Sequence, residues 1–594
     1  MQQLKGDAVP TRPVGAGEPS PPEKPAPVTR SGRLVAGTLV NVAMIVLIGY
    51  LVLVPLVILL YSSFKSSTTQ LPFQVPGFSV TNYLNVFESS HFASVAWNTV
   101  LYVVGSLLVA LVLSMSLAYL MERTDLPCRR FLAPMALAPM AVPVTVMAIA
   151  WALVANPVNG PLAVAVRNVL GLHIDIYSLP GMILVMGIFG VPSMYLTIAP
   201  AFARLNPELE EAAAALGVPL RRRLRLIVLP LVAPAVSAAG MLLVVVALEG
   251  FAIPAILGLP KQIFVFSSQI QYYVQPPTGV PNFGQASTYG VLLLAVSLIM
   301  LLVYRRRTRD AHRFRVVSGK GYRQTRVALG RWRVPVFVAV CLYLLIGIAL
   351  PLLTLVWTSL SPYTRPISIS NLGSMTLANY GTVFTAPGMG HSLLNTAWVV
   401  LLTATISTAI STWLAVAASR RQFPGSTVLF EATFLVFGIP SVVLGFAVLF
   451  LYVFIPVPPL YGTVWIIIVA LVARYLPRGS RMVQTALLQL DDGLVEAAQV
   501  TGARPFTVTR TVLVPLLSPA LRKCWLWIFA QALGELPIAL VLTSSDNRTL
   551  VVELWNIFTS SGDYPTASAL AVIILVVSTM AVWSVNRRGA MEES

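Results

Sequence analysis

Two glutamates lie within long apolar stretches, in corresponding parts of the chain, and carry the charges best placed to act inside a membrane. Glu249 lies 19 positions after Pro230, and Glu535 lies 20 positions after Pro515. An ionisable side chain in a membrane span is costly and usually faces a cavity or a partner. Two carboxylates along one pathway would favour a cation, whereas carboxylates that cap or hydrogen-bond a broken helix would be structural. The sequence leaves both interpretations open.

The other reactive residue types give no support to catalysis or metal binding. His91 and His391 both fall at the outer start of a predicted second span, and no HxxH motif or His/Cys cluster accompanies them. The three cysteines form no CxxC motif, so neither a disulfide framework nor a metal site is indicated. No Ser/Lys, Asp/Asp or His/Glu constellation lies within the predicted spans. We therefore predict no catalytic residue and no metal ligand in this chain.

A nucleotide site is not predicted either. Gly319-Lys320 is similar to the end of a phosphate-binding loop, but that loop needs glycine at position 314, where the chain has Phe314. No predicted strand precedes the segment. We expect the chain to bind no cofactor of its own.

A second pattern occurs twice, in alanine-rich loops. Its members are Glu211, Ala212, Ala213 and Gly217 in the first copy, and Glu496, Ala497, Ala498 and Gly502 in the second. Glu, Ala and Leu form helices readily, so each loop should build a helix of about two turns. Glycine tolerates the left-handed conformation in which helices commonly end. Small alanines would let a partner approach closely, so the two helices could bind two equivalent sockets on a dimer.

Helices must position these residues, because the chain is 57% hydrophobic and 10% charged over 594 residues. Apolar runs of about 17 residues or more can cross a bilayer, and in lipid their backbone groups need partners within the segment. We predict an all-α polytopic membrane protein with about twelve transmembrane helices in two homologous six-helix halves. The predicted spans are 36–62, 92–121, 132–155, 180–203, 228–257 and 286–304, then 334–360, 391–418, 428–454, 462–483, 512–542 and 565–586.

The predicted organisation follows from these spans. Residues 1–33 form a proline-rich, disordered cytoplasmic tail, and the first apolar segment is too long for a cleavable signal. The first repeat covers 34–304, a basic cytoplasmic linker covers 305–333, the second repeat covers 334–588, and a short cytoplasmic tail covers 589–594.

Basic residues orient the predicted spans. With a cytoplasmic amino terminus, all but five of the 40 Lys and Arg fall on the cytoplasmic side, as the positive-inside rule requires. The exceptions are Lys65, Arg167, Lys261, Arg365 and Arg548 in the outer loops. The cytoplasmic set includes residues placed toward the inner ends of spans ten and eleven: Arg474, Arg478, Arg481, Arg522 and Lys523. The net charge of +18 is therefore attributed to topology and contact with membrane lipid rather than nucleic acid, and both termini are expected in the cytoplasm.

The two halves repeat in sequence. Five short matches recur at an offset of 297 positions. They pair Asn82-Tyr83 with Asn379-Tyr380, Phe87 with Phe384, Asn98-Thr99 with Asn395-Thr396, Pro127 with Pro424, and Pro143 with Pro440. A long-period repeat predicts a two-fold architecture. Because each half has an even number of spans, the pseudo-two-fold axis should run along the membrane normal.

The twin loops resemble the signature of a known family. The first copy, from Glu211 to Pro230, follows the pattern E-A-A-x3-G-x9-I-x-L-P of permeases in binding-protein-dependent ABC importers. The second keeps the pattern except for Val512 and Val514. The resemblance covers nearly the whole chain after residue 33. It implies a type I importer permease in a bacterial inner membrane. It also implies that both loops couple to a homodimeric ATP-binding subunit on the cytoplasmic side.

The same resemblance implies further partners. ATP and Mg would be bound by the partner ATPase, and a periplasmic solute-binding protein would deliver the solute. A fused double permease is most similar to the group that imports ferric iron, thiamine, polyamines or phosphonates such as 2-aminoethylphosphonate. Gly534–Pro537 and Glu249–Pro254 resemble ferric-iron permeases most, so iron is the favoured solute.

Two other classes of protein are less well supported. A secondary transporter can also have two six-span halves, but it would need ion-coupling residues within its spans and gives no reason for twin coupling loops. An intramembrane enzyme would need a convergent catalytic constellation, which the sequence lacks. Transport driven by an ion gradient alone would favour the first alternative.

Overall fold

The computed structural model describes residues 31–65, 72–205, 207–276, 280–309, 326–420, 425–455, 458–491 and 505–592, together with 493, 497, 498, 500 and 502. Glu496, most of the predicted tail and most of the predicted linker lie outside these residues. Residues 48–594 form one compact unit and residues 1–47 another. The contacts below all lie within residues 48–594.

Long apolar helices dominate the part of the chain that is described. Nine of them are long and apolar enough to cross a membrane. In the first half they belong to α1 (Ser31–Ser63), α3 (Ser90–Arg123), α7 (Leu179–Ala203), α10 (Leu229–Glu249) and α12 (Phe283–Arg309). In the second half they belong to α13 and α14 (Arg333–Leu344 and Leu350–Ser359, one span), α16 (Met389–Ser419), α22 (Val514–Leu533) and α25 (Tyr564–Glu592).

The other three predicted spans are also helical, but they are broken or charged. Helix α4 (Arg129–Leu137) with its short extension to Ala141 meets α5 (Val144–Val154) at a bend of 105°. Helix α17 (Ser426–Phe437) is followed by α18 (Ser441–Phe454), and α19 (Val464–Leu487) carries three arginines. The predicted all-α polytopic fold is therefore confirmed.

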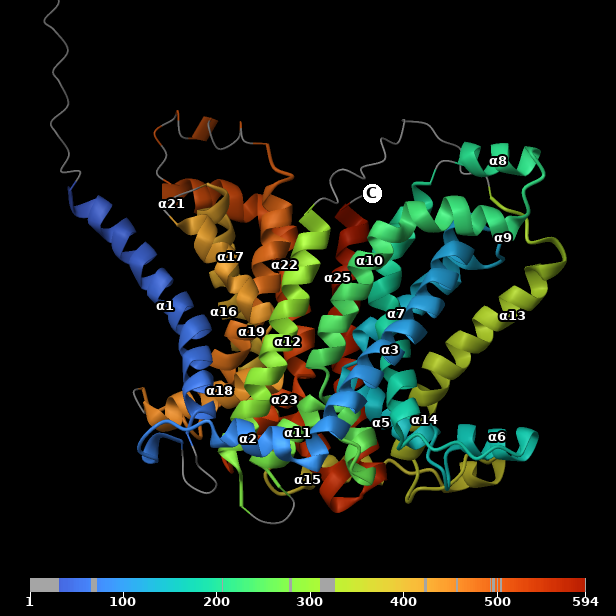
Figure 1. Cartoon of the computed structure of the whole chain (residues 1–594), viewed down its shortest axis with the longest axis horizontal. Coiled ribbons are helices and arrows are strands. Elements are labelled where there is room, and N and C mark those ends of the chain that lie inside the picture. The colour runs from blue at the N-terminus through green and yellow to red at the C-terminus, as the bar shows by residue number, and fades with distance from the viewer. Residues whose placement is uncertain are drawn as a thin grey trace, which may run out of the picture. The chain divides into compact units, whose positions relative to one another are not determined.

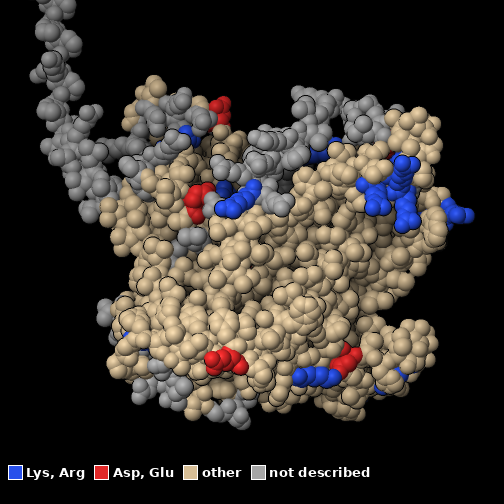
Figure 2. Space-filling view, in the orientation of Figure 1, with Lys and Arg blue, Asp and Glu red and all other residues tan. Residues whose placement is uncertain are grey.

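Shorter helices gather at the two ends of this unit (Figure 1). Helices α8 (Pro207–Ala215), α9 (Leu220–Arg223) and α21 (Pro505–Val508) lie at one end. Helices α2 (Thr81–Glu88), α6 (Pro161–Leu170), α11 (Phe266–Val274) and α15 (Ala378–Thr385) lie toward the other. On the face drawn in Figure 2, charged side chains gather at both ends and leave an uncharged band between them. Such a band is what a hydrocarbon core requires.

The repeat that the sequence predicts also appears in the hydrogen bonds. Asn82 Nδ2 donates to two carbonyl groups at the end of α1, at 3.1 and 2.6 Å. Asn379 Nδ2 donates to two carbonyl groups at the end of α14, both at 2.8 Å. Tyr83 and Tyr380 each share a 2.8 Å hydrogen bond with a serine hydroxyl at the same place. These residues therefore fix the turn after the first span of each repeat.

A second repeated pair fixes the segment that follows the fifth span. Thr99 Oγ1 accepts from the first amide of α11 at 3.0 Å. Thr396 Oγ1 accepts from the first amide of α24 (Leu550–Asn556) at 2.8 Å. The neighbouring Asn98 and Asn395 donate to carbonyl groups just before those helices. The first amides of a helix have no partner within the helix, so the two threonines supply one.

The repeats pack against each other through aromatic and proline-bearing segments. Phe283 of α12 lies 5.6 Å from Phe450 of α18, measured between ring centroids. Phe73 stacks on Phe454 at 3.8 Å. On the other side, Ser578 of α25 donates to the carbonyl of Ala141, at the bend before α5, at 2.8 Å. The last of these contacts lies at the break in the third span of the first repeat, so protein covers the irregular backbone there.

Candidate coupling helices and the charge cluster between the repeats

The first alanine-rich loop forms the helix that its sequence predicts. Helix α8 is nine residues long, with Glu211 and Ala212 exposed and Ala213 half-buried. Gly217 follows with φ of +74°, and the amide of Val218 donates to the carbonyl of Ala213 at 3.0 Å. This bond, made around a left-handed glycine, satisfies a carbonyl at the end of the helix. The loop thus presents a short helix with an exposed face.

The second loop matches the first wherever it is described. Ala497 and Ala498 are helical, the former exposed and the latter half-buried. Gly502 is exposed and has φ of +80°. Glu496 lies outside the described residues, so its position stays a prediction.

Each loop leads into a fifth span through the same irregularity. A single π-helical turn covers Leu224–Val228 before Pro230, and another covers Thr509–Leu513 before Pro515. Proline donates no amide and its ring crowds the carbonyl four residues earlier, so a wider turn accommodates it. Helices α10 and α22 then run from the loops toward Glu249 and Glu535.

Glu249 forms an ion pair with the opposite repeat. It is the last residue of α10, and its carboxylate accepts from both terminal nitrogens of Arg474 of α19. The longer contact, between Arg474 Nη1 and Glu249 Oε1, measures 3.5 Å. The side chains are 12% and 7% exposed for Arg474 and Glu249. Arg474 also donates to the carbonyl of Ile439, at the break before α18, at 3.0 Å. This pair joins the two repeats.

The expectation that Arg474 lies toward the cytoplasmic end of its span is wrong. It occupies the middle of the 24-residue α19, within the bundle. An arginine can be buried there because Glu249 balances its charge and a carbonyl accepts a further hydrogen. Counting basic residues along the sequence treats each charge alone and misses such a partner.

Glu535 lies beside the same arginine. It precedes α23 (Leu536–Val541) and accepts from Tyr475, the neighbour of Arg474, at 3.4 Å. One turn along α19, the guanidinium of Arg478 lies over the rings of Phe437 and Trp527, at 4.8 and 5.6 Å from their centroids. Sequence reasoning missed the roles of Arg474, Tyr475 and Arg478, although the Arg-Tyr-x-x-Arg run in an apolar helix was a signal.

The structure thus brings both predicted glutamates into one cluster, which we call the inter-repeat charge cluster: Glu249, Arg474, Tyr475, Arg478 and Glu535. Glu249 pairs with Arg474, and Glu535 and Arg478 lie close enough to that pair to interact with its charges. The pairing of Glu249 with Arg474 favours the structural interpretation of that glutamate, and the role of both glutamates in a pathway stays a prediction.

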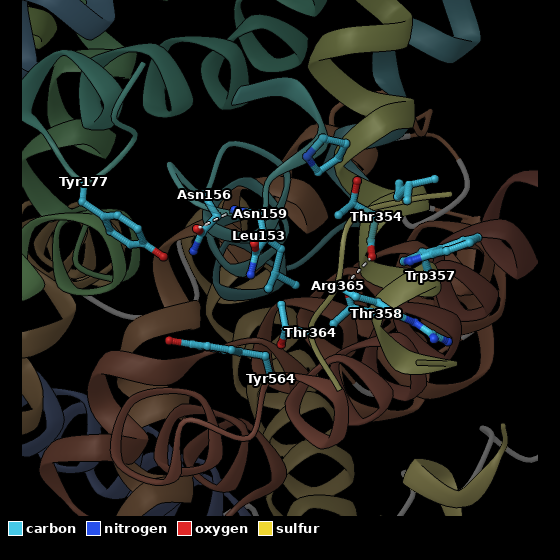
Figure 3. A pocket seen from close by; sticks show the side chains of 12 residues that line it. Leu153, Asn156, Asn159, Tyr177, Thr354, Trp357, Thr358, Thr364, Arg365 and Tyr564 are labelled. Carbon is cyan, nitrogen blue, oxygen red and sulfur yellow. Dashed lines mark hydrogen bonds between the residues drawn. The ribbon is translucent and has the colours of Figure 1, made fainter. Parts of the chain in front are cut away.

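A polar pocket lies between the repeats at the end of the unit where α6 lies (Figure 3). Its volume is about 390 Å³, including space open to solvent. Asn156, Asn159 and Tyr177 line it from the first repeat, and Thr358 and Tyr564 from the second. Burial raises the pKa of Tyr177 to about 12. The sequence analysis singled out none of these residues, because loops and helix ends from both repeats bring them together.

The fold is a two-repeat helical membrane bundle in which a loop with a left-handed glycine leads into each fifth span. The chain belongs to the family described as the binding-protein-dependent transport system inner membrane component, whose model matches residues 110–311 and 407–587. The two matches fall one in each repeat, which confirms the internal duplication.

Individual relatives carry different solutes in their names. A ferric transport system permease protein of Actinobacillus pleuropneumoniae is 25% identical over 68% of this chain and 58% of its own length. An Fe(3+)-transport system permease protein of Haemophilus influenzae is 22% identical over 86% of this chain and 92% of its own. A sulfate transport system permease protein of Salmonella typhimurium is 30% identical over 37% of this chain and 83% of its own. The chain spans 58% of the length of the first two curated relatives that it matches.

Proposed function

We propose that this chain is the membrane-spanning permease subunit of an ATP-driven importer and moves a small solute by alternating access. The supporting observation is that two loops share the signature residues and, where described, the left-handed glycine. Each leads through a five-residue π-helical turn into α10 or α22. Those helices reach the inter-repeat charge cluster, so a force applied to either loop has a rigid path to the boundary between the repeats.

Energy enters through the two loops in this proposal. Glu211, Ala212, Ala213 and Gly217, with Glu496, Ala497, Ala498 and Gly502, form the surface that a homodimeric ATP-binding subunit grips on the cytoplasmic side. ATP and Mg are bound by that subunit. Its closure must bind one arrangement of the loops better than the other, because only a difference in affinity shifts a conformational equilibrium. The permease therefore acts as a lever and hydrolyses nothing itself.

Ferric iron is the proposed solute, delivered by a periplasmic solute-binding protein at a bacterial inner membrane. Two relatives named for ferric transport support this choice. Relatives named for sulfate and for spermidine and putrescine keep other solutes open. Thiamine and 2-aminoethylphosphonate are further alternatives. We place both termini in the cytoplasm, since the basic residues favour that orientation.

The test is uptake into proteoliposomes that contain this chain and the ATP-binding subunit that purifies with it. Ferric ion, spermidine, thiamine and 2-aminoethylphosphonate are offered in turn, each with the binding protein that retains it. The permeases that are assayed have their cytoplasmic face toward the vesicle lumen. We expect ATP enclosed in the lumen to drive accumulation of the solute, and an ion gradient without ATP to drive none. Accumulation driven by the gradient alone would replace the importer with a secondary transporter.

A further inference from the structure

The first coupling helix is tied to the bundle by a residue outside the signature pattern. Glu210 of α8 accepts a hydrogen bond from the guanidinium of Arg123, the last residue of α3. The side chains of Arg123 and Glu210 are only 3% and 6% exposed. Arg123 Nη1 also donates to the carbonyl of Leu205 at 3.2 Å. Glu210 and the exposed Glu211 therefore have opposite roles, one turned into the protein and one turned out.

A second arginine holds the same helix from the other side. Arg223 Nη1, at the end of α9, donates to the backbone carbonyl of Glu210 at 3.3 Å. Helix α8 is thus bonded both to α3 and to the segment that leads into α10. A buried ion pair is costly to break by removal of one partner, because the other charge is left without compensation.

The end of α3 is itself bonded to the chain that begins the second repeat. The amide of Val327 donates to the carbonyl of Arg123 at 2.8 Å, and the amide of Asp125 donates to the carbonyl of Val327 at 3.3 Å. The Asp125 carboxylate accepts from the amide of Leu329 at 2.9 Å. Helix α13 starts four residues later. An unbroken series of bonds therefore runs from α8, through Arg123, to the first span of the second repeat.

The second coupling loop has no equivalent of Glu210. With the offset of 285 that aligns Glu211 with Glu496, Glu210 aligns with Val495. Valine has no side-chain acceptor for an arginine. The two loops share the signature residues but differ at this position.

We propose that Arg123 and Glu210 are positioning residues that make the first coupling helix move as one body with α3 and the start of α13. This inference rests on the proposed function for the role of α8. The anchor itself is a property of the chain alone and can be tested without any partner.

Hydrogen–deuterium exchange on the purified full chain, in nanodiscs, measures the anchor directly. Glu210→Gln should raise the exchange rate of the amides of α8 and Gly217 by about tenfold or more, because a buried charge loses its partner, and leave residues 497–502 unchanged. The charge exchange Arg123→Glu with Glu210→Arg should restore most of the protection. Arg222→Gln is the matched control, since Arg222 is an exposed neighbour on α9 and its loss should change nothing.

The outcomes separate the anchor from the proposed function. Unchanged exchange in Glu210→Gln, or no recovery in the charge-exchanged protein, overturns the anchor while leaving the importer assignment intact. If Glu210→Gln does not insert stably, recovery in the charge-exchanged protein still decides. In vesicles with the ATP-binding subunit, Glu210→Gln should lower uptake about tenfold while ATP hydrolysis continues. An equal loss in Arg222→Gln would overturn the specific role of the pair.

Discussion

The ion pair between Glu249 and Arg474 allows the sharpest prediction about the bundle. Glu249→Gln removes the carboxylate that pairs with Arg474, which is 12% exposed and keeps the Ile439 carbonyl as one acceptor and the charge of Glu535 nearby. Removing one partner of a buried pair costs about 3–5 kcal/mol. Because one acceptor remains, we expect about 3 kcal/mol of lost unfolding free energy, at the lower end of that range.

The assay is unfolding of the purified chain in mixed micelles by titration with denaturing detergent. Arg474→Gln combined with Glu249→Gln removes both charges, so the double variant should recover most of the loss. The matched control involves the same helix: Arg481 of α19 and Glu431 of α17 form an ion pair at 3.4 Å, but their side chains are 46% and 36% exposed. Glu431→Gln should therefore cost less than about 1 kcal/mol.

Two results would refute this reasoning. Glu249→Gln could prove no less stable than Glu431→Gln, or the double variant could lose as much as the two single variants added together. Transport separates the two interpretations of Glu249. If its role is structural, the double variant should recover transport together with stability. If the carboxylate serves a cation pathway, the double variant should recover stability but not transport.

Three further predictions follow from single contacts. Gly502→Val should uncouple ATP hydrolysis from uptake, because a φ of +80° costs a β-branched residue about 1–2 kcal/mol. Gly502→Asn should keep most of the coupling. Equal coupling in both variants would contradict the role of this glycine. Thr99→Val should lower the unfolding free energy by about 1–3 kcal/mol, since a buried amide loses its acceptor. Thr99→Ser should leave the unfolding free energy unchanged. An unchanged unfolding free energy in Thr396→Val would show that the two repeats differ here. Gly534→Ala should destabilise the chain by about 1–3 kcal/mol in detergent titration, because the added carbon would lie 2.6 Å from Pro143 Cβ of the other repeat. An unchanged unfolding transition would mean that the repeats separate easily at this point.

Local sequence patterns were enough to predict the elements. Hydrophobic run length predicted the nine long apolar helices found in the described residues, because the bilayer sets that length independently of the neighbours; it did not predict the breaks in the third spans. The glycine that ends α8 was predicted for a similar reason: a left-handed turn depends on the local backbone, and Gly217 adopts it. The 297-residue offset of Asn82 and Thr99 revealed the repeat, although only the structure shows that these residues anchor the turn and the short helix.

Pairings between the repeats could not be predicted in the same way. Glu249 and Arg474 are 225 positions apart, and no local pattern joins them. The positive-inside rule even pointed away from the pair, since it assigns a lone arginine to the cytoplasmic surface. The anchor at Glu210 was missed although it lies next to the signature residue Glu211. The periodicity of a helix alone did not show which of these two adjacent glutamates faces the protein.

The central claim is that both alanine-rich loops engage an ATP-binding subunit. The direct measurement is disulfide or bifunctional cross-linking from single cysteines at Ala212 and Ala497, both exposed, after Cys128, Cys341 and Cys524 have been replaced. Val169→Cys, exposed on α6 at the other end, is the control. The account predicts cross-links to the nucleotide-hydrolysing subunit from positions 212 and 497 and none from 169. Cross-links from neither loop, or labelling of both loops by an impermeant thiol reagent added outside intact cells, would contradict it.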